Sequence, residues 1–221
     1  MKYLYLALLI VVSTIHLIDS YKDDAKKRAR TKGFLLPLIL LFYLASVKEY
    51  SWVLIAALIT SWLGDVLLIP KGNKWFIMGG LSFLASHILF MFTYLPNISF
   101  GNVVWYVVIP AAVIYFSIAG WIIVNILPNT PKMMIAPMFA YLIANSSMNV
   151  FALMQLVSAP CAGSAIAYIG AVLFFISDCT LFLVRYHKKP DIVFKRHFTV
   201  MLTYVLGELL ITQGVIMLSA I

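Results

Sequence analysis

Four ionisable side chains lie inside apolar stretches of the sequence: Asp65, His87, Asp178 and Glu208. An ionisable group at the centre of a membrane costs about 2.5 to 3.5 kcal/mol on insertion scales, so it normally faces the interior of a helix bundle and marks a site or a pathway. Two carboxyl groups that lie close together in a low-dielectric cavity cannot both ionise easily, and they share one proton. These residue types therefore predict general acid–base chemistry by Asp65 and Asp178.

The composition indicates which elements position these groups. The chain has 221 residues, of which 63% are hydrophobic and 11% are charged, and this balance is typical of an integral membrane protein. A helix needs about 20 apolar residues to cross the hydrocarbon core. We expect an all-α helical bundle, a single transmembrane domain over residues 1–221, with eight transmembrane helices at residues 2–18, 33–47, 50–69, 75–95, 103–127, 132–157, 163–184 and 197–219. A re-entrant hairpin is the competing interpretation of the second and third runs, since only Lys48 and Glu49 separate them.

The basic residues behind the net charge of +8 are concentrated in every second loop between the predicted helices. This distribution indicates a membrane topology and argues against nucleic acid as a partner. Fourteen of the sixteen Lys and Arg residues follow the first, third, fifth and seventh predicted helices. Under the positive-inside rule these four loops are cytoplasmic, and both termini lie outside the cytoplasm. We expect the first helix to be retained rather than cleaved as a signal peptide, and the location to be a bacterial inner (plasma) membrane.

The two halves of the sequence share three motifs, each offset by four predicted helices. "KGFLLPLILLFYLAS" matches "KMMIAPMFAYLIANS", "LGDVLLI" matches "ISDCTLF", and "SFLASHILF" matches "TYVLGELLI". An even offset predicts a 4+4 parallel pseudo-repeat with putative halves 1–101 and 102–221. In this arrangement Asp65 faces Asp178 and His87 faces Glu208, while Gly64 and Ser177 leave space beside the two aspartates.

The depth of the two aspartates supports their pairing. Asp65 lies six residues before Lys71 and Asp178 seven before Arg185, so at about 1.5 Å per residue both lie roughly 10 Å inside the cytoplasmic boundary. Purely structural roles stay open as alternatives. Either aspartate could serve as a structural hydrogen-bonding group, and His87 and Glu208 could form hydrogen bonds across helix interfaces. The Asn and Tyr side chains that share these faces, Asn145 and Tyr204 among them, are more often interhelical contacts than chemistry.

Other kinds of site lack their signatures. A zinc site needs three or four clustered ligands, and no such His or Cys spacing is visible, so we expect no metal and no cofactor. No Gly-x-Ser-x-Gly elbow or other serine nucleophile motif is visible either. Among the kinds of site considered, the sequence therefore favours acid–base catalysis by the pair of carboxyl groups, Asp65 and Asp178.

At these residues the chain resembles the lysoplasmalogenase (YhhN) family of polytopic membrane proteins. The resemblance rests on "SWLGDVLL", "GGLSFLASHILFMFTY", "FFISDCTLFLVRY" and "TYVLGELLI", and it extends over most of the chain. Two departures are visible: Gly33 follows Lys32 where the family tends to have Lys-Pro, and Glu208 stands where relatives often have Gln. The resemblance implies eight membrane helices and hydrolysis of the vinyl ether bond of lysoplasmalogens, which gives a fatty aldehyde and glycerophosphoethanolamine or glycerophosphocholine.

That reaction gives the polar residues expected roles. One aspartate would protonate the β-carbon of the vinyl ether, and the other would stabilise the oxocarbenium ion and take a proton from water, with the assignment left open. His87, Asn145 and Tyr204 would orient water or the glycerol hydroxyl. The phosphate would meet Lys32 and Lys132, the equivalent lysines of the two halves, with Lys74 and Arg185 nearby; for these four, ordinary positive-inside placement is the alternative.

Two other classes of function fit the same residues. Intramembrane acids and a His in pseudo-symmetric halves also describe a proton-coupled transporter. A structural or sensing protein that binds lipid without turnover is the third interpretation. The expected partners are a lysophospholipid substrate and the surrounding membrane lipids, and the sequence does not predict an oligomeric state.

Overall fold

The computed structural model describes residues 1–220, and over this range the chain folds into α-helices without any strand, which confirms the all-α prediction. Eight α-helices follow one another in the order α1 (Lys2–Tyr21), α2 (Ala25–Leu44), α3 (Trp52–Leu67), α4 (Asn73–Tyr94), α5 (Trp105–Ile126), α6 (Lys132–Ser158), α7 (Ala162–Tyr186) and α8 (His197–Leu218). Short 3-10 turns lie in the connections at Leu95–Asn97, Phe100–Asn102, Leu127–Asn129 and Pro190–Ile192.

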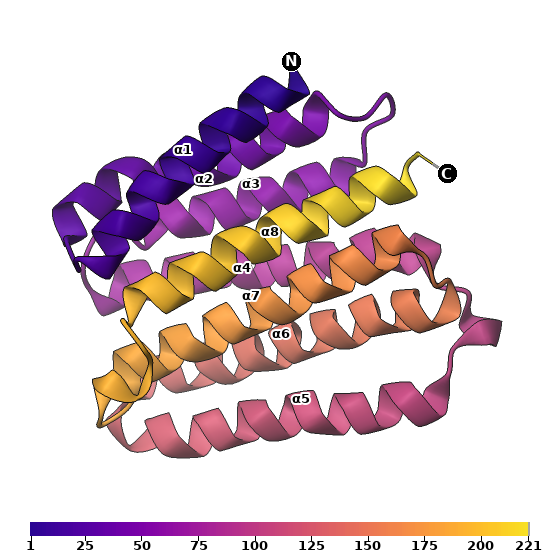
Figure 1. Ribbon diagram of the computed structural model, residues 1–221. Helices are drawn as coiled ribbons and strands as arrows, with labels where there is room; N and C mark the ends of the chain where they lie inside the picture. Colours follow the sequence, from indigo (N-terminus) through magenta and orange to yellow (C-terminus); the bar gives the residue numbers. More distant parts are fainter. Residues whose placement is uncertain (221) are drawn as a thin grey trace.

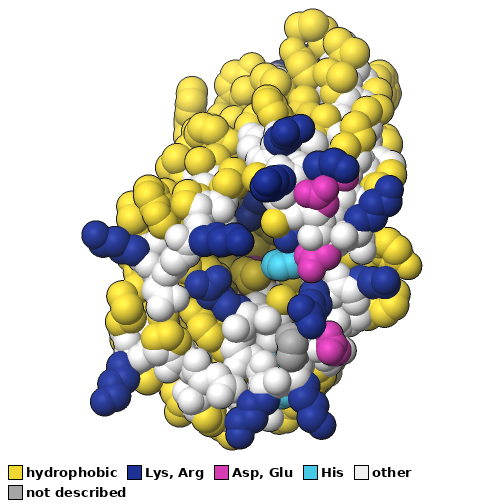
Figure 2. Space-filling model, turned by 90° about the vertical axis from the view of Figure 1, so that its left-hand side faces the viewer, with side chains coloured by type: hydrophobic (Ala, Val, Ile, Leu, Met, Phe, Trp, Pro, Cys, Tyr) yellow, Lys and Arg dark blue, Asp and Glu magenta, His cyan; other side chains and the backbone are white. Residues whose placement is uncertain are grey.

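Successive helices run in opposite directions along the bundle (Figure 1). The connections after α1, α3, α5 and α7 lie together at the left-hand end in Figure 1, and both chain termini lie away from it. Figure 2 views this end directly and shows Lys and Arg side chains spread across it. We call it the basic end; it comprises residues 22–32, 68–74, 127–132 and 185–197, in which fourteen of the sixteen basic residues lie.

Six of the eight helices are long and apolar enough to cross a membrane, which is consistent with an integral membrane protein. The exceptions are α2, whose first turns are rich in Lys and Arg, and α3, which has 16 residues. These two helices are separate and antiparallel, and they are joined through residues 45–51, an arrangement that two membrane crossings and a long re-entrant hairpin would share (Figure 1). The expectation of eight membrane crossings and the choice of cytoplasmic side therefore stay predictions.

Helix α2 begins eight residues before the predicted run because its basic segment is helical. The Asp24 side chain accepts a hydrogen bond from the Lys27 amide at 3.1 Å and caps the helix. Arg28 donates to the Asp23 carboxylate at 2.6 Å, and this bond holds the pKa of Asp23 below its usual range. As a result Lys32 lies two turns inside α2, on a helix face that can point into the bundle, rather than in a loop.

Helices α7 and α8 pack with their backbones in contact, because glycines face one another along the interface. A Cβ added to Gly170 would lie 2.5 Å from a backbone nitrogen of α8, and one added to Gly214 would lie 2.6 Å from the Gly163 carbonyl oxygen. Small residues at such an interface let helices approach more closely than larger side chains would. The close packing fixes the position of Asp178 on α7 relative to Tyr204 on α8.

The buried core is centred on α4, α6, α7 and α8, where apolar side chains surround a polar interior. Helices α1 and α5 lie at the periphery and expose large apolar side chains such as Ile10, Val113 and Val124. An apolar outer surface around a partly polar interior is the arrangement expected where lipid replaces water as the solvent. The residues that could do chemistry therefore lie inside the bundle.

Candidate active site

A cavity of about 150 Å³ opens at the basic end between α2, α3, α4, α7 and α8. Figure 2 shows it as a hollow among Lys and Arg side chains. Asp65 and Asp178 both contribute to its wall, so the structure brings the two predicted acids to one cavity. The other lining residues are Lys32, Leu68, Phe76, Phe83, Ser177, Leu181, Arg185, His197, Val200, Met201 and Tyr204.

Asp65 stands in the last turn of α3 and uses both of its carboxyl oxygens. Lys32 Nζ lies 3.2 Å from Oδ1, and the Tyr204 hydroxyl donates to Oδ2 at 2.9 Å. The Asp65 residue is 2% exposed and the Lys32 side chain 17%, so the ion pair is largely shielded from solvent. A buried charge needs such a partner, and here helix α2 supplies a cation and helix α8 a neutral donor.

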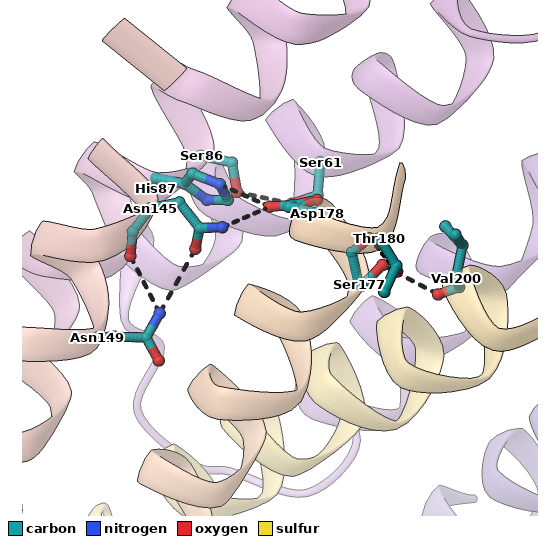
Figure 3. A network of polar contacts seen from close by, with 9 residues as sticks. All are labelled: Ser61, Ser86, His87, Asn145, Asn149, Ser177, Asp178, Thr180 and Val200. Carbon is teal, nitrogen blue, oxygen red and sulfur yellow. Dashed lines mark hydrogen bonds and ion pairs between the residues drawn. The ribbon is translucent and has the colours of Figure 1, made fainter. Parts of the chain in front are cut away.

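Asp178 is held differently, by side chains from the centre of the bundle (Figure 3). His87 Nε2 of α4 lies 3.0 Å from Asp178 Oδ2, and Asn145 of α6 donates to the same oxygen at 3.1 Å. Asn149, one turn further along α6, donates to the Asn145 carbonyl at 3.0 Å. Because both of these bonds reach Oδ2, Oδ1 takes part in neither of them, and Asp178 is one of the residues that line the cavity.

Aromatic rings enclose the two acid sites. His87 contacts the edges of Tyr141 at 5.0 Å and Phe174 at 4.9 Å between ring centroids, and Tyr204 packs against Phe174 at 5.4 Å. These rings exclude water from the inner side of the cavity and fix the orientations of His87 and Tyr204. Water and polar ligands therefore reach the acids from the basic end.

Gly64 does not leave space beside Asp65, contrary to expectation, whereas Ser177 lines the cavity next to Asp178. The ring of Phe83 occupies the position beside Gly64, where an added Cβ would lie 2.5 Å from it. The Ser177 hydroxyl donates to the Val200 carbonyl at 2.9 Å and so ties α7 to α8 (Figure 3). Both small residues serve helix packing around the acids.

Glu208 lies one turn beyond Tyr204 on α8 and is fully buried. Its two carboxyl oxygens make no hydrogen bond to other atoms in residues 1–220, and it does not line the cavity. Among the described residues, no hydrogen bond or ion pair joins His87 to Glu208 or Asp65 to Asp178. The pairing that the pseudo-repeat predicts therefore stays a prediction.

The basic residues proposed for a phosphate divide into two groups. Lys32 and Arg185 line the cavity, whereas Lys74 and Lys132 begin α4 and α6 as exposed residues that do not line it. From the sequence we expect Arg185 only near the phosphate ligands and not among them. Its position seven residues after Asp178 places it on the same face of α7. His197 lies seven residues before Tyr204 and so on the same face of α8, and both line the cavity. No role for His197 is predicted from the sequence, although this spacing could have indicated one.

No group of three or more His, Cys, Asp or Glu side chains within residues 1–220 is arranged to hold a metal ion. Neither the comparison with curated proteins nor the comparison with solved structures returned a match. The model of the YhhN family matches residues 28–215, a range that includes Asp65, His87, Asp178 and Glu208. Because this match covers most of the chain, the protein belongs to the YhhN family, which includes lysoplasmalogenases.

Proposed function

We propose that this protein is an intramembrane hydrolase that cleaves the vinyl ether bond of lysoplasmalogens to a fatty aldehyde and a glycerophospho-alcohol. Membership of the YhhN family suggests a membrane enzyme of this type. The observation that carries the proposal is that two carboxyl groups with different hydrogen-bond donors line one cavity at the basic end. In the proposed orientation this end faces the cytoplasm of a bacterial inner membrane, so the lysolipid enters from the cytoplasmic leaflet.

The different surroundings support different proposed roles for the two acids. Lys32 and Tyr204 both donate to Asp65, which suits a group that acts as a carboxylate. His87 and Asn145 reach only Oδ2 of Asp178, so Oδ1 can carry a proton without breaking either bond. In this proposal Asp178 is the general acid, and Asp65 stabilises the cation and acts as the general base.

The reaction then proceeds in three balanced steps. Asp178 transfers its proton to the β-carbon of the vinyl ether, and the resulting oxocarbenium ion is stabilised by the Asp65 carboxylate. Water adds to the cationic carbon and gives a proton to Asp65, which leaves a hemiacetal. Asp178 then takes the hemiacetal hydroxyl proton as the C–O bond breaks, and Asp65 returns its proton to the departing glycerol oxygen, so that both acids are restored.

The test is mass analysis of lipids incubated with the purified protein. A lysoplasmalogen should yield one fatty aldehyde for each glycerophospho-alcohol, and the saturated 1-O-alkyl analogue should stay intact because it has no double bond to protonate. A proton-coupled transporter would instead move lipid or solute across vesicles in response to a proton gradient and alter no product. A structural lipid-binding protein would give binding with neither turnover nor transport, and either of these results would refute the proposal.

A further inference from the structure

We propose that Arg185 forms the subsite for the phosphate of a lysophospholipid at the mouth of the cavity. This inference rests on the proposed function for the identity of the lipid, and it adds a substrate requirement: the phosphate is recognised and the alcohol attached to it is not. Arg185 lines the cavity from the last turn of α7, where the cavity meets the basic end.

The guanidinium of Arg185 is held in place by neutral groups. It lies over the ring of Phe76 with 3.8 Å between the guanidinium carbon and the ring centroid. Its Nε donates to the Tyr186 hydroxyl at 3.0 Å, and one terminal nitrogen donates to the Asn73 side chain at 3.4 Å. A guanidinium has five N–H groups, so donors are left over for a ligand, and stacking keeps the fork in one orientation.

Two Lys or Arg side chains line the cavity, and Arg185 differs from Lys32 in having no carboxylate partner among the described residues. Salt bridges pair Lys27 with Asp24, Arg28 with Asp23, Arg196 with Asp191 and Lys32 with Asp65. No carboxylate within residues 1–220 lies within salt-bridge distance of Arg185. The cavity wall therefore presents a cation that is not neutralised by an acid of the described chain, and phosphate oxygens match the geometry of its fork.

The spacing along α7 fits a lysophospholipid. Arg185 lies seven residues beyond Asp178, which places it two turns and roughly 10 Å closer to the basic end. In a lysoplasmalogen the glycerol unit separates the phosphate from the vinyl ether. A phosphate on Arg185 thus directs the vinyl ether inward, toward Asp178 and Asp65, and leaves the ethanolamine or choline outside the cavity.

The experiment measures binding separately from turnover. The probe is a 1-O-alkyl lysophosphatidylethanolamine, which the reaction cannot cleave, and its partner is the 1-O-alkylglycerol that lacks phosphate. Because a hydrogen-bonded charge contributes about 1.5 to 3 kcal/mol, Arg185→Gln should weaken binding of the phosphorylated probe at least tenfold. The same change should not affect the alkylglycerol. Lys71→Gln, which removes an exposed cation of the same end that does not line the cavity, is the matched control and should bind like the wild type.

Each outcome decides the inference. Equal binding of the phosphorylated probe by the wild type and Arg185→Gln would overturn it, as would equal affinity of the wild type for the two probes, a test that requires no variant. Displacement of the probe by inorganic phosphate at equal concentration would assign the subsite to free anions and overturn the lipid assignment. Tight, Arg185-dependent binding without release of aldehyde from any lysoplasmalogen would support the subsite and refute the proposed hydrolase.

Discussion

His87 Nε2 lies 3.0 Å from Asp178 Oδ2, although 91 residues separate them in sequence. The corresponding partner of Asp65 is Lys32, at 3.2 Å. One acid of the cavity is thus bound to an imidazole at the centre of the bundle and the other to an ammonium near the basic end. The two carboxyl groups are not equivalent, and the mechanism proposed above depends on this difference.

Asp178→Asn and Asp65→Asn should each reduce aldehyde release by about 10²- to 10⁴-fold, the range over which a positioned acid or base accelerates proton transfer. Release of aldehyde from a lysoplasmalogen, followed by mass spectrometry, measures the loss. Asp191→Asn is the matched control, since this exposed acid of the basic end does not line the cavity. Full activity in both site variants would refute the carboxylate mechanism.

Lys32→Met should reduce aldehyde release and also lower stability, because Asp65 loses its cationic partner inside the bundle. Removing one member of a buried ion pair lowers the free energy of unfolding by about 3 to 5 kcal/mol. Because Lys32 is partly exposed, we expect a loss of about 3 kcal/mol or less. Thermal unfolding in detergent measures the loss of stability. Lys26→Met removes an exposed cation of the same helix and should leave both quantities unchanged. Activity equal to wild type in Lys32→Met would show that Asp65 does not need this charge.

His87→Phe should lower kcat by about tenfold or more and leave KM nearly unchanged, because His87 orients Asp178 and does not line the cavity. His87→Asn, which can still donate to Asp178, should restore part of the rate. Tyr94→Phe is the matched control on α4, since it removes a buried hydroxyl that has no hydrogen-bond partner within residues 1–220. A change in KM alone would assign His87 to substrate binding instead of positioning.

Gly170→Ala should destabilise the protein by about 1 to 3 kcal/mol, the usual effect of extra atoms in a well-packed core, because the added Cβ meets the backbone of α8. Gly120→Ala on α5 is the matched control, with nothing within 4 Å of an added Cβ. Denaturation monitored by circular dichroism compares the two. Equal stability of the two variants would contradict the backbone contact between α7 and α8.

The sequence was sufficient for the helical class, the family and the location of the acids. Asp65 and Asp178 could be picked out because a carboxyl group is rare inside an apolar run, and their depth could be counted from Lys71 and Arg185. That both line one cavity agrees with this reasoning. Periodicity and hydropathy are local properties of the sequence. They are sufficient to locate a site residue whose polarity differs sharply from that of its neighbours, as Asp65 and Asp178 do.

The partners of the acids could not be read in the same way. A repeat motif predicts which residues are equivalent, but the rotation of each helix decides which side chains meet, and that depends on packing such as the ring of Phe83 beside Gly64. The equivalence of Lys32 and Lys132 predicts phosphate ligands at the cytoplasmic edge, and this role of Lys32 stays a prediction. Its ion pair with Asp65 could not be predicted from that equivalence, because it depends on the helical form of the basic segment that Asp24 caps.

The backbone contact between α7 and α8 gives the cavity one rigid wall. Asp178 stands on that wall, whereas Asp65 stands on the opposite wall formed by α3. A movement that widens the cavity for a lipid therefore displaces α2, α3 or α4 rather than separating α7 from α8. A displacement of α3 changes the separation of the two carboxyl groups, so in the proposed mechanism the entry of substrate and the alignment of the two acids both depend on the position of α3.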